Sequence, residues 1–192
     1  MPSAKVKRVR QVLTEAGGVL VGQTEACTVS TQQDYEYMID FLASRGRNKE
    51  RINNILGKPI ITSTMEDCPQ IKKFVYHRLA KRAEEIAAEL GEYFTVEPSS
   101  YQKDGNDSGE ITRRGINKSY GMKKYLDYYG LSKEDAIAFG DAANDVDMLV
   151  FAGIGVVMGN GREEVKAWAD FVTKDVNADG IAYAMKKLGL IG

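Results

Sequence analysis

The sequence contains few of the residues from which zinc sites and disulfide frameworks are built. Its 192 residues include two cysteines, Cys27 and Cys68, and one histidine, His77. The cysteines have no paired spacing, and His77 follows the apolar run Phe74-Val75-Tyr76 rather than a ligand pattern. A disulfide framework or a zinc site is therefore not expected. We predict a reduced globular protein in which His77 has a structural role at the end of a strand.

Net charge and long apolar runs are also lacking. The 26 basic and 27 acidic side chains leave a formal charge of −1, which gives no general attraction to nucleic acid or to an anionic membrane. No apolar run has the length of a membrane span, and no signal-peptide pattern opens the chain. We expect a cytoplasmic protein without nucleic-acid or membrane partners. With 43% hydrophobic residues, the chain can bury one large core or two small ones.

The first 113 residues predict an α/β layer. Leu79, Ala83, Ile86, Ala87 and Leu90 form the clearest amphipathic helix, which ends at Gly91. Two further helices are expected at 5–16 and from 35 to about 46. Strands are expected at 19–21, 26–29, 60–61, 71–76, 94–96 and 110–112. The polar stretch from 98 to 109 between the last two strands predicts an exposed turn.

From Gly115 the pattern changes to a regular alternation of strands and helices. Met122, Tyr125, Leu126 and Tyr129 recur at helical spacing and predict the apolar side of one helix, which ends at Gly130. Strands are expected at 136–139, 154–157 and 171–173, and helices at 144–151, around 165–169 and at 181–188. Such alternation favours a parallel sheet covered by helices. The change of pattern places a boundary between two α/β units near residues 113 to 115.

The segment from Ile137 to Leu149 predicts the chemistry. An apolar strand leads into Gly140, and Asp141 and Asp145 follow with Asn144 between them. Carboxylates at the end of a buried strand are costly unless a positive partner meets them, and Mg²⁺ is the simplest hard cation for oxygen ligands. Asn144 either contacts the metal shell or a phosphate, or caps the following helix. Asp147 is expected to be solvated only.

Four segments occur in an order typical of a known family. They are Gly115-Ile116-Asn117-Lys118-Ser119, the Gly140-Asp141 to Asn144-Asp145 segment, Gly155 to Asn160, and Asn177-Ala178-Asp179-Gly180. Together they resemble the C-terminal half of the haloacid dehalogenase superfamily, in its Cof-type sugar-phosphatase branch. The resemblance is dense from about 115 to 190. Upstream it is looser, where the layout is similar to the large α/β cap of that branch.

The resemblance implies roles for five residues. Members of the family transfer a phosphoryl group from the substrate to an aspartate and then to water, with Mg²⁺ as cofactor. Lys118 matches the catalytic lysine, which binds phosphate and nucleophile; otherwise it is an ordinary surface lysine. Asp141 matches the acidic metal ligand. Asp145 matches the second acidic position of the metal site, which holds a metal-bound water or orients the loop. Asn144 and Asn160 are further candidates for substrate binding. The implied substrate is a small phosphorylated metabolite such as a sugar phosphate.

The chain also departs from the family pattern. The family's nucleophile and general acid lie in an Asp-x-Asp signature on an N-terminal strand, but the one Asp-x-Asp here is Asp145-Val146-Asp147, inside the metal segment. The resemblance therefore implies a cap at 1–113 and the C-terminal half of a Rossmann-like core at 114–192. We expect this chain to be inactive alone, and to self-associate or to bind a missing N-terminal half in trans. A non-catalytic binding module and one half of a split phosphatase remain alternatives.

Overall fold

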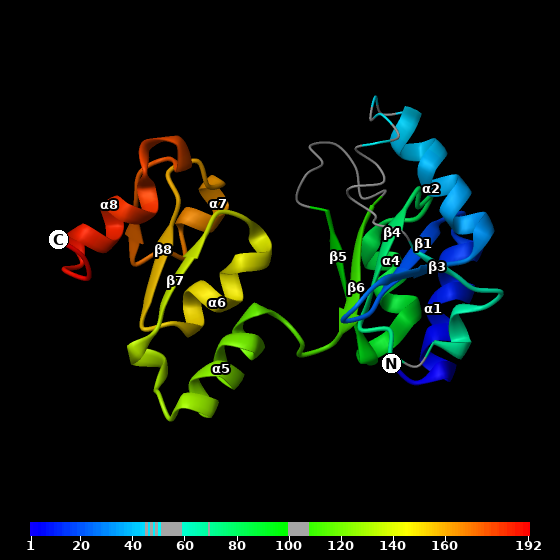
Figure 1. The fold of residues 1–192 in the computed structure, drawn as a ribbon, viewed down its shortest axis with the longest axis horizontal. Helices are drawn as coiled ribbons and strands as arrows, with labels where there is room; N and C mark the ends of the chain where they lie inside the picture. The colour runs from blue at the N-terminus through cyan, green and yellow to red at the C-terminus, as the bar shows by residue number, and fades with distance from the viewer. Residues whose placement is uncertain (45, 47, 49, 51–58, 69, 100–107) are drawn as a thin grey trace. The chain divides into compact units, whose positions relative to one another are not determined.

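The computed structural model describes residues 1–44, 46, 48, 50, 59–68, 70–99 and 108–192. The polar turn expected at 98–109 therefore lies mostly outside the described residues. The chain divides into two compact units, Met1–Arg114 and Gly115–Gly192, which are called unit 1 and unit 2 below. Each unit has its own sheet (Figure 1).

Unit 1 is built on a six-stranded sheet with the order β3-β2-β1-β4-β6-β5. The strands are β1 (Val19–Gln23), β2 (Thr28–Ser30), β3 (Ile60–Ile61), β4 (Lys73–His77), β5 (Phe94–Pro98) and β6 (Gly109–Arg113). Neighbouring strands are antiparallel, except for the parallel pair β2 and β3. All six strands predicted from the sequence are present, and their pairing makes the sheet mixed.

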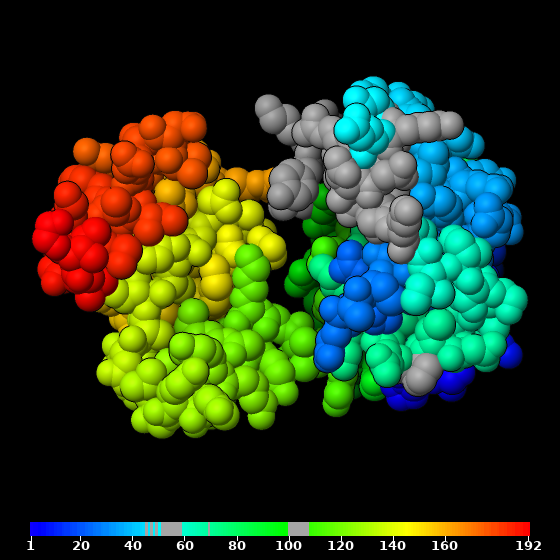
Figure 2. Space-filling view, viewed as in Figure 1, coloured from blue at the N-terminus to red at the C-terminus, as the bar shows by residue number. Residues whose placement is uncertain are grey.

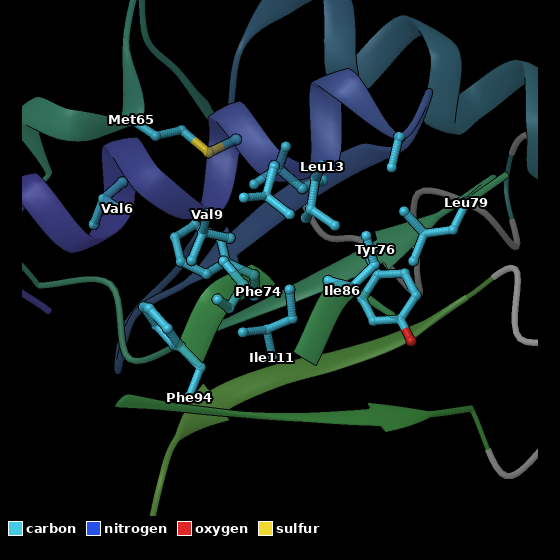
Figure 3. Close-up of a cluster of buried hydrophobic side chains, with 14 of the residues drawn as sticks. Val6, Val9, Leu13, Met65, Phe74, Tyr76, Leu79, Ile86, Phe94 and Ile111 are labelled. Carbon is cyan, nitrogen blue, oxygen red and sulfur yellow. The ribbon is translucent and has the colours of Figure 1, made fainter. Parts of the chain in front are cut away.

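Helices pack on both faces of this sheet. Successive residues of a strand point to opposite faces, so Leu20 joins one core cluster, while Val19 and Val21 join another. The first cluster lies beneath α1 (Ser3–Glu15) and α4 (Ala83–Leu90), and the second beneath α2 (Gln32–Ser44). Figure 3 shows the larger cluster, with side chains of α1 packed toward the aromatic and aliphatic residues of the sheet. Two further short helices of this unit are described, η1 (Met65–Asp67) and η2 (Gly91–Tyr93).

Unit 2 has a parallel three-stranded sheet, as the alternation of strands and helices predicted. The strands β7 (Ile137–Gly140), β8 (Ile154–Val157) and β9 (Phe171–Val172) lie in the order β7-β8-β9. The helices are α5 (Lys118–Tyr129), η3 (Lys133–Asp135), η4 (Ala143–Asp145), α6 (Val146–Phe151), α7 (Glu163–Lys166), η5 (Val176–Ala178) and α8 (Gly180–Lys187). The core is small and is centred on Ala138, Leu149, Val157 and Val165. Within the described residues, β7 pairs with β8 alone, so its other edge is open.

Two helix predictions in unit 2 are wrong in detail. Met122 and Leu126 turn inward, but Tyr125 and Tyr129 are exposed, and their rings contact each other at a tilt of 48° with centroids 4.6 Å apart. The helical period identifies a side of α5, but the contact with α6 covers only part of that side. The helix expected around 165–169 ends at Lys166, and Trp168 lies beyond it with 56% of its surface exposed.

In the described part of the chain, no helix has the length and apolar character that crossing a membrane requires.

Candidate functional site

The carboxyl end of β7 forms a tight turn around Asp145. The Oδ2 atom of Asp145 accepts hydrogen bonds from the backbone N–H groups of Asp141, at 3.0 Å, and Ala142, at 3.2 Å. Gly140 allows this close approach, because a Cβ atom at that position would lie 2.5 Å from the Cβ of Asp145. The glycine at the end of the strand is therefore a structural requirement of the turn.

Lys118 reaches the same carboxylate from the start of α5. Asn117 caps this helix, since its Oδ1 atom accepts a hydrogen bond of 2.9 Å from the backbone N–H of Tyr120. Lys118 is the first residue of the helix, where a cation is unfavourable next to the helix dipole. Its ammonium group donates to Oδ1 of Asp145 and forms an ion pair with it. The Lys118 side chain is 48% exposed and that of Asp145 only 5%, so one end of the pair remains accessible to a ligand.

The Asp145 carboxyl is held in its charged form. Burial by itself acts to raise its pKa, but the hydrogen bond from Lys118 and those from the backbone at Asp141 and Ala142 lower it. The net pKa lies below the ordinary value of 3.8. Because both of its oxygens already accept hydrogen bonds, Asp145 is suited to orienting Lys118 and the turn. Its role at a metal ion stays a prediction.

Asp141 differs from Asp145 in having a free carboxylate. It is exposed after the end of β7, and within the described residues no hydrogen bond or ion pair joins its side chain. Its backbone oxygen accepts from the N–H of Arg162 at 3.1 Å, which fixes the position of its backbone. No group of three or more His, Cys, Asp or Glu side chains gathers in the part of the chain that is described. The arrangement fits Mg²⁺ held by one carboxylate, because this ion commonly keeps several waters.

Within the described residues, no hydrogen bond joins Asn144 or Asn160 to Lys118, Asp141 or Asp145. Asn144 lies exposed inside η4, whereas the residue preceding η4 is Ala142 and the one preceding α6 is Asp145. The interpretation of Asn144 as a helix cap is therefore wrong. Asn160 follows β8, and its Oδ1 atom accepts from the backbone N–H of Val176 at 2.9 Å. It thereby joins two loops at the carboxyl edge of the sheet, and its role toward a substrate stays a prediction.

Asp147 has a partner that the sequence analysis missed. Its Oδ2 atom accepts a hydrogen bond of 2.5 Å from Nδ2 of Asn117, so the expectation that it is solvated only is wrong. An asparagine before a helix predicts a cap, which could have singled out Asn117. Nothing in the local pattern indicates a partner 30 residues away.

Comparison with protein families and known proteins gives a consistent result. A family model for haloacid dehalogenase-like hydrolases matches residues 2–185. The chain is 49% identical over 78 residues to the 5-amino-6-(5-phospho-D-ribitylamino)uracil phosphatase YitU of Bacillus subtilis, covering 41% of this chain and 29% of that protein. It is 35% identical over 119 residues to the pyridoxal phosphate phosphatase YbhA of Escherichia coli, covering 62% of this chain and 38% of that protein.

Solved structures match over the entire chain. A protein of Geobacillus kaustophilus has a TM-score of 0.76 at 28% identity and covers 100% of this chain, which spans 69% of that protein. The subclass IIB sugar phosphatase BT4131 has a TM-score of 0.72 at 25% identity, with shares of 100% and 68%. The matches thus span about a third of the two curated relatives and about two thirds of these structures. Together with the parallel sheet and the four ordered segments, these matches place the chain in the haloacid dehalogenase-like hydrolase family, in its Cof-type branch.

Proposed function

We propose that this chain provides the metal- and phosphate-binding part of a Mg²⁺-dependent phosphatase that acts on a small phosphorylated metabolite. In this proposal, residues 114–192 are the C-terminal half of the catalytic core and residues 1–113 are its cap. The supporting observation is the pairing of the accessible Lys118 ammonium with the buried Asp145, next to the free carboxylate of Asp141.

Each residue has a separate task in the proposed chemistry. Lys118 places a positive charge against the phosphate group of the substrate, and Asp145 fixes the position of that charge. Asp141 would hold Mg²⁺, which when bound draws charge from the phosphoryl oxygens. Asn144 and Asn160 are proposed as further contacts to the substrate, because both are exposed polar side chains in segments that follow strands of the parallel sheet.

The names of relatives support the proposed class of substrate. YitU and YbhA are named as phosphatases of a phosphoribitylamino uracil and of pyridoxal phosphate, and BT4131 is described as a sugar phosphatase. These compounds are small organic molecules that carry a phosphate ester. We therefore propose a phosphate monoester of this size as the substrate, without nucleic acid or membrane as a partner.

We also propose that this chain alone does not turn over phosphate esters. Its one Asp-x-Asp segment is Asp145-Val146-Asp147, and both carboxylates are already engaged by Lys118 and Asn117. A phosphoryl-accepting aspartate is thus not available from this segment. Residues 1–192 would bind phosphometabolites without hydrolysing them.

Binding and turnover can be tested separately. Purified chain is titrated with Mg²⁺ or Mn²⁺ by calorimetry, and weak binding is expected. Asp141→Asn should abolish this binding, whereas Asp67→Asn, an exposed aspartate of unit 1, should leave it intact. Equal binding by wild type and Asp141→Asn would remove Asp141 from its proposed role. Incubation with an aryl phosphate and a panel of sugar phosphates should give no turnover, and a rate of about 1 per second or more would refute the proposed inactivity.

A further inference from the structure

The N-terminal ends of α5 and α6 are connected by two neighbouring side-chain contacts. Lys118 of α5 binds Asp145, the residue immediately before α6. Asn117, the residue before Lys118, donates from Nδ2 to Oδ2 of Asp147, the second residue of α6, at 2.5 Å. Two consecutive residues at the start of one helix thus bind two nearly consecutive residues at the start of the other.

The oxygen and the nitrogen of the Asn117 side-chain amide bind different partners. The Oδ1 atom accepts from the backbone N–H of Tyr120 and from the hydroxyl of Ser119, each at 2.9 Å, which begins and caps α5. A cap needs only this oxygen. The Nδ2 donor is used for the bond to Asp147 instead, so the cap alone does not explain why an amide occupies this position.

The bond to Asp147 restricts the position of Lys118. A lysine side chain has several rotatable bonds, and fixing it costs conformational entropy. The half-exposed ammonium of Lys118 also has water as a competing partner. Because Asn117 is hydrogen-bonded to Asp147 of α6, the distance between the backbone of Lys118 and Asp145 is restricted.

We propose that Asn117 and Asp147 are positioning residues that hold Lys118 in register with Asp145, and through it set the affinity of the site for phosphate. The effect on phosphate affinity rests on the proposed function of Lys118. The effect on the geometry of the Lys118–Asp145 ion pair does not depend on any activity.

Three substitutions distinguish this role from helix capping. Asn117→Ser keeps a side-chain oxygen for the cap and removes the Nδ2 donor, and Asp147→Ala removes the acceptor. In the double variant Asn117→Asp with Asp147→Asn, the donor and the acceptor exchange places while the number of atoms and charges is kept. Asp127→Ala is the matched control, because Asp127 is an exposed acid near the other end of α5 that pairs with Lys123.

Two measurements are made on each folded variant. The first is the ¹⁵N resonance of the Lys118 ammonium at low temperature, assigned by its loss in Lys118→Arg. The second is the dissociation constant for inorganic phosphate in the presence of Mg²⁺. Asn117→Ser and Asp147→Ala should each broaden the ammonium signal and weaken phosphate binding about threefold, the size expected for one exposed hydrogen bond. Their effects should not add, and the exchanged pair should restore both readings.

The outcomes distinguish the positioning role of Asn117 and Asp147 from the proposed phosphate-binding function of Lys118. An unchanged ammonium signal in both single variants overturns the positioning role, whatever happens to phosphate. A wild-type chain that binds no phosphate counts against the proposed function, and the ammonium signal still decides the positioning role. If the single variants do not fold, failure of the exchanged pair to restore the signal refutes the role, and its recovery supports it.

Discussion

At the scale of the residue, the charge of Lys118 balances a carboxylate that water hardly reaches. The Asp145 side chain is 5% exposed and keeps its charge because Lys118 and two backbone N–H groups bind it. A buried charge that loses its partner is costly, since the remaining group retains the penalty of desolvation. Exposed ion pairs are worth little by comparison.

Lys118→Met, which removes the charge and keeps most of the side-chain length, should therefore destabilise unit 2. We expect a loss of about 1–3 kcal/mol in the free energy of unfolding, toward the lower end because Lys118 is half-exposed. Urea titration followed by the fluorescence of Trp168, the single tryptophan of the chain, measures the change in unit 2. Lys123→Met removes an exposed pair with Asp127 and should cost less than about 1 kcal/mol. Equal losses in the two variants would contradict the structural role of Lys118.

A pH dependence is expected from Glu66 in unit 1. Burial acts to raise its pKa, but hydrogen bonds from Thr64 and the Glu66 backbone N–H, together with Arg10, lower it below the ordinary value of 4.5. A carboxyl whose pKa is lower in the folded state stabilises the fold above its unfolded pKa, and this contribution is lost as the pH falls through the folded pKa.

Glu66→Gln should therefore destabilise the protein most near neutral pH. The difference from wild type should shrink as the pH falls below 4.5, because the wild-type carboxyl then becomes protonated. Urea titrations at a series of pH values measure this difference. Glu84→Gln, on an exposed position of α4, should change stability little at any pH. A difference for Glu66→Gln that grows toward low pH would contradict the sign of the effect.

At the scale of the element, glycines have opposite roles in α5 and β8. Gly121 lies within α5, and a Cβ atom there would have no neighbour within 4 Å. Gly155 lies in β8, where a Cβ atom would lie 2.5 Å from the backbone oxygen of Leu149 in α6. The first glycine only weakens its helix, whereas the second allows α6 and β8 to approach each other.

Alanine at these two positions should thus change stability in opposite directions. Gly121→Ala should stabilise unit 2 by about 0.5–1 kcal/mol, because alanine loses less backbone entropy in a helix. Gly155→Ala should destabilise it by about 1–3 kcal/mol, because the backbone of α6 must move away from β8. The fluorescence of Trp168 in urea reports both changes. Destabilisation by Gly121→Ala would show that α5 is not a regular helix at this position.

At the scale of the whole molecule, apolar surface is concentrated in unit 2. Within the described residues, fourteen large hydrophobic side chains of this unit are exposed, against three in unit 1. Several lie on α5, which is lime green in the space-filling view and lies at the surface of its unit (Figure 2). The open edge of β7 adds backbone groups that can pair with another strand. Exposed apolar patches with an open sheet edge favour association.

We therefore predict that the chain self-associates at high concentration. Sedimentation velocity should show dimers or larger species whose fraction rises with concentration. Replacing Tyr125 and Tyr128 with serine should reduce this fraction, because it removes exposed rings from α5. Tyr37→Ser removes an exposed ring from unit 1 and should have no effect.

Two outcomes would change this interpretation of unit 2. A monomer at every concentration would mean that unit 2 tolerates its exposed apolar surface. A polypeptide carrying the part of the solved relatives that this chain does not match should compete with self-association if it binds the same surface.

Local features of the sequence were sufficient to predict most elements and the parallel sheet of unit 2. A glycine marks the end of α5, and alternating strand and helix patterns indicate parallel strands. The family and the candidate residues Lys118, Asp141 and Asp145 followed from ordered segments, because each segment is short and its spacing is visible in one dimension. These features depend on neighbours along the chain, which the sequence displays directly.

The tertiary structure decided which of these residues meet. Lys118 and Asp145 are 27 positions apart, and Asn117 and Asp147 are 30 apart, so their contacts depend on how α5 packs against α6. The exposure of Tyr125 has the same origin, because a periodic pattern identifies one side of a helix but not how much of it a neighbour covers. Likewise, the pleat of β1 separates Leu20 from Val21, but only the packed fold places α1 and α4 over the first face and α2 over the second.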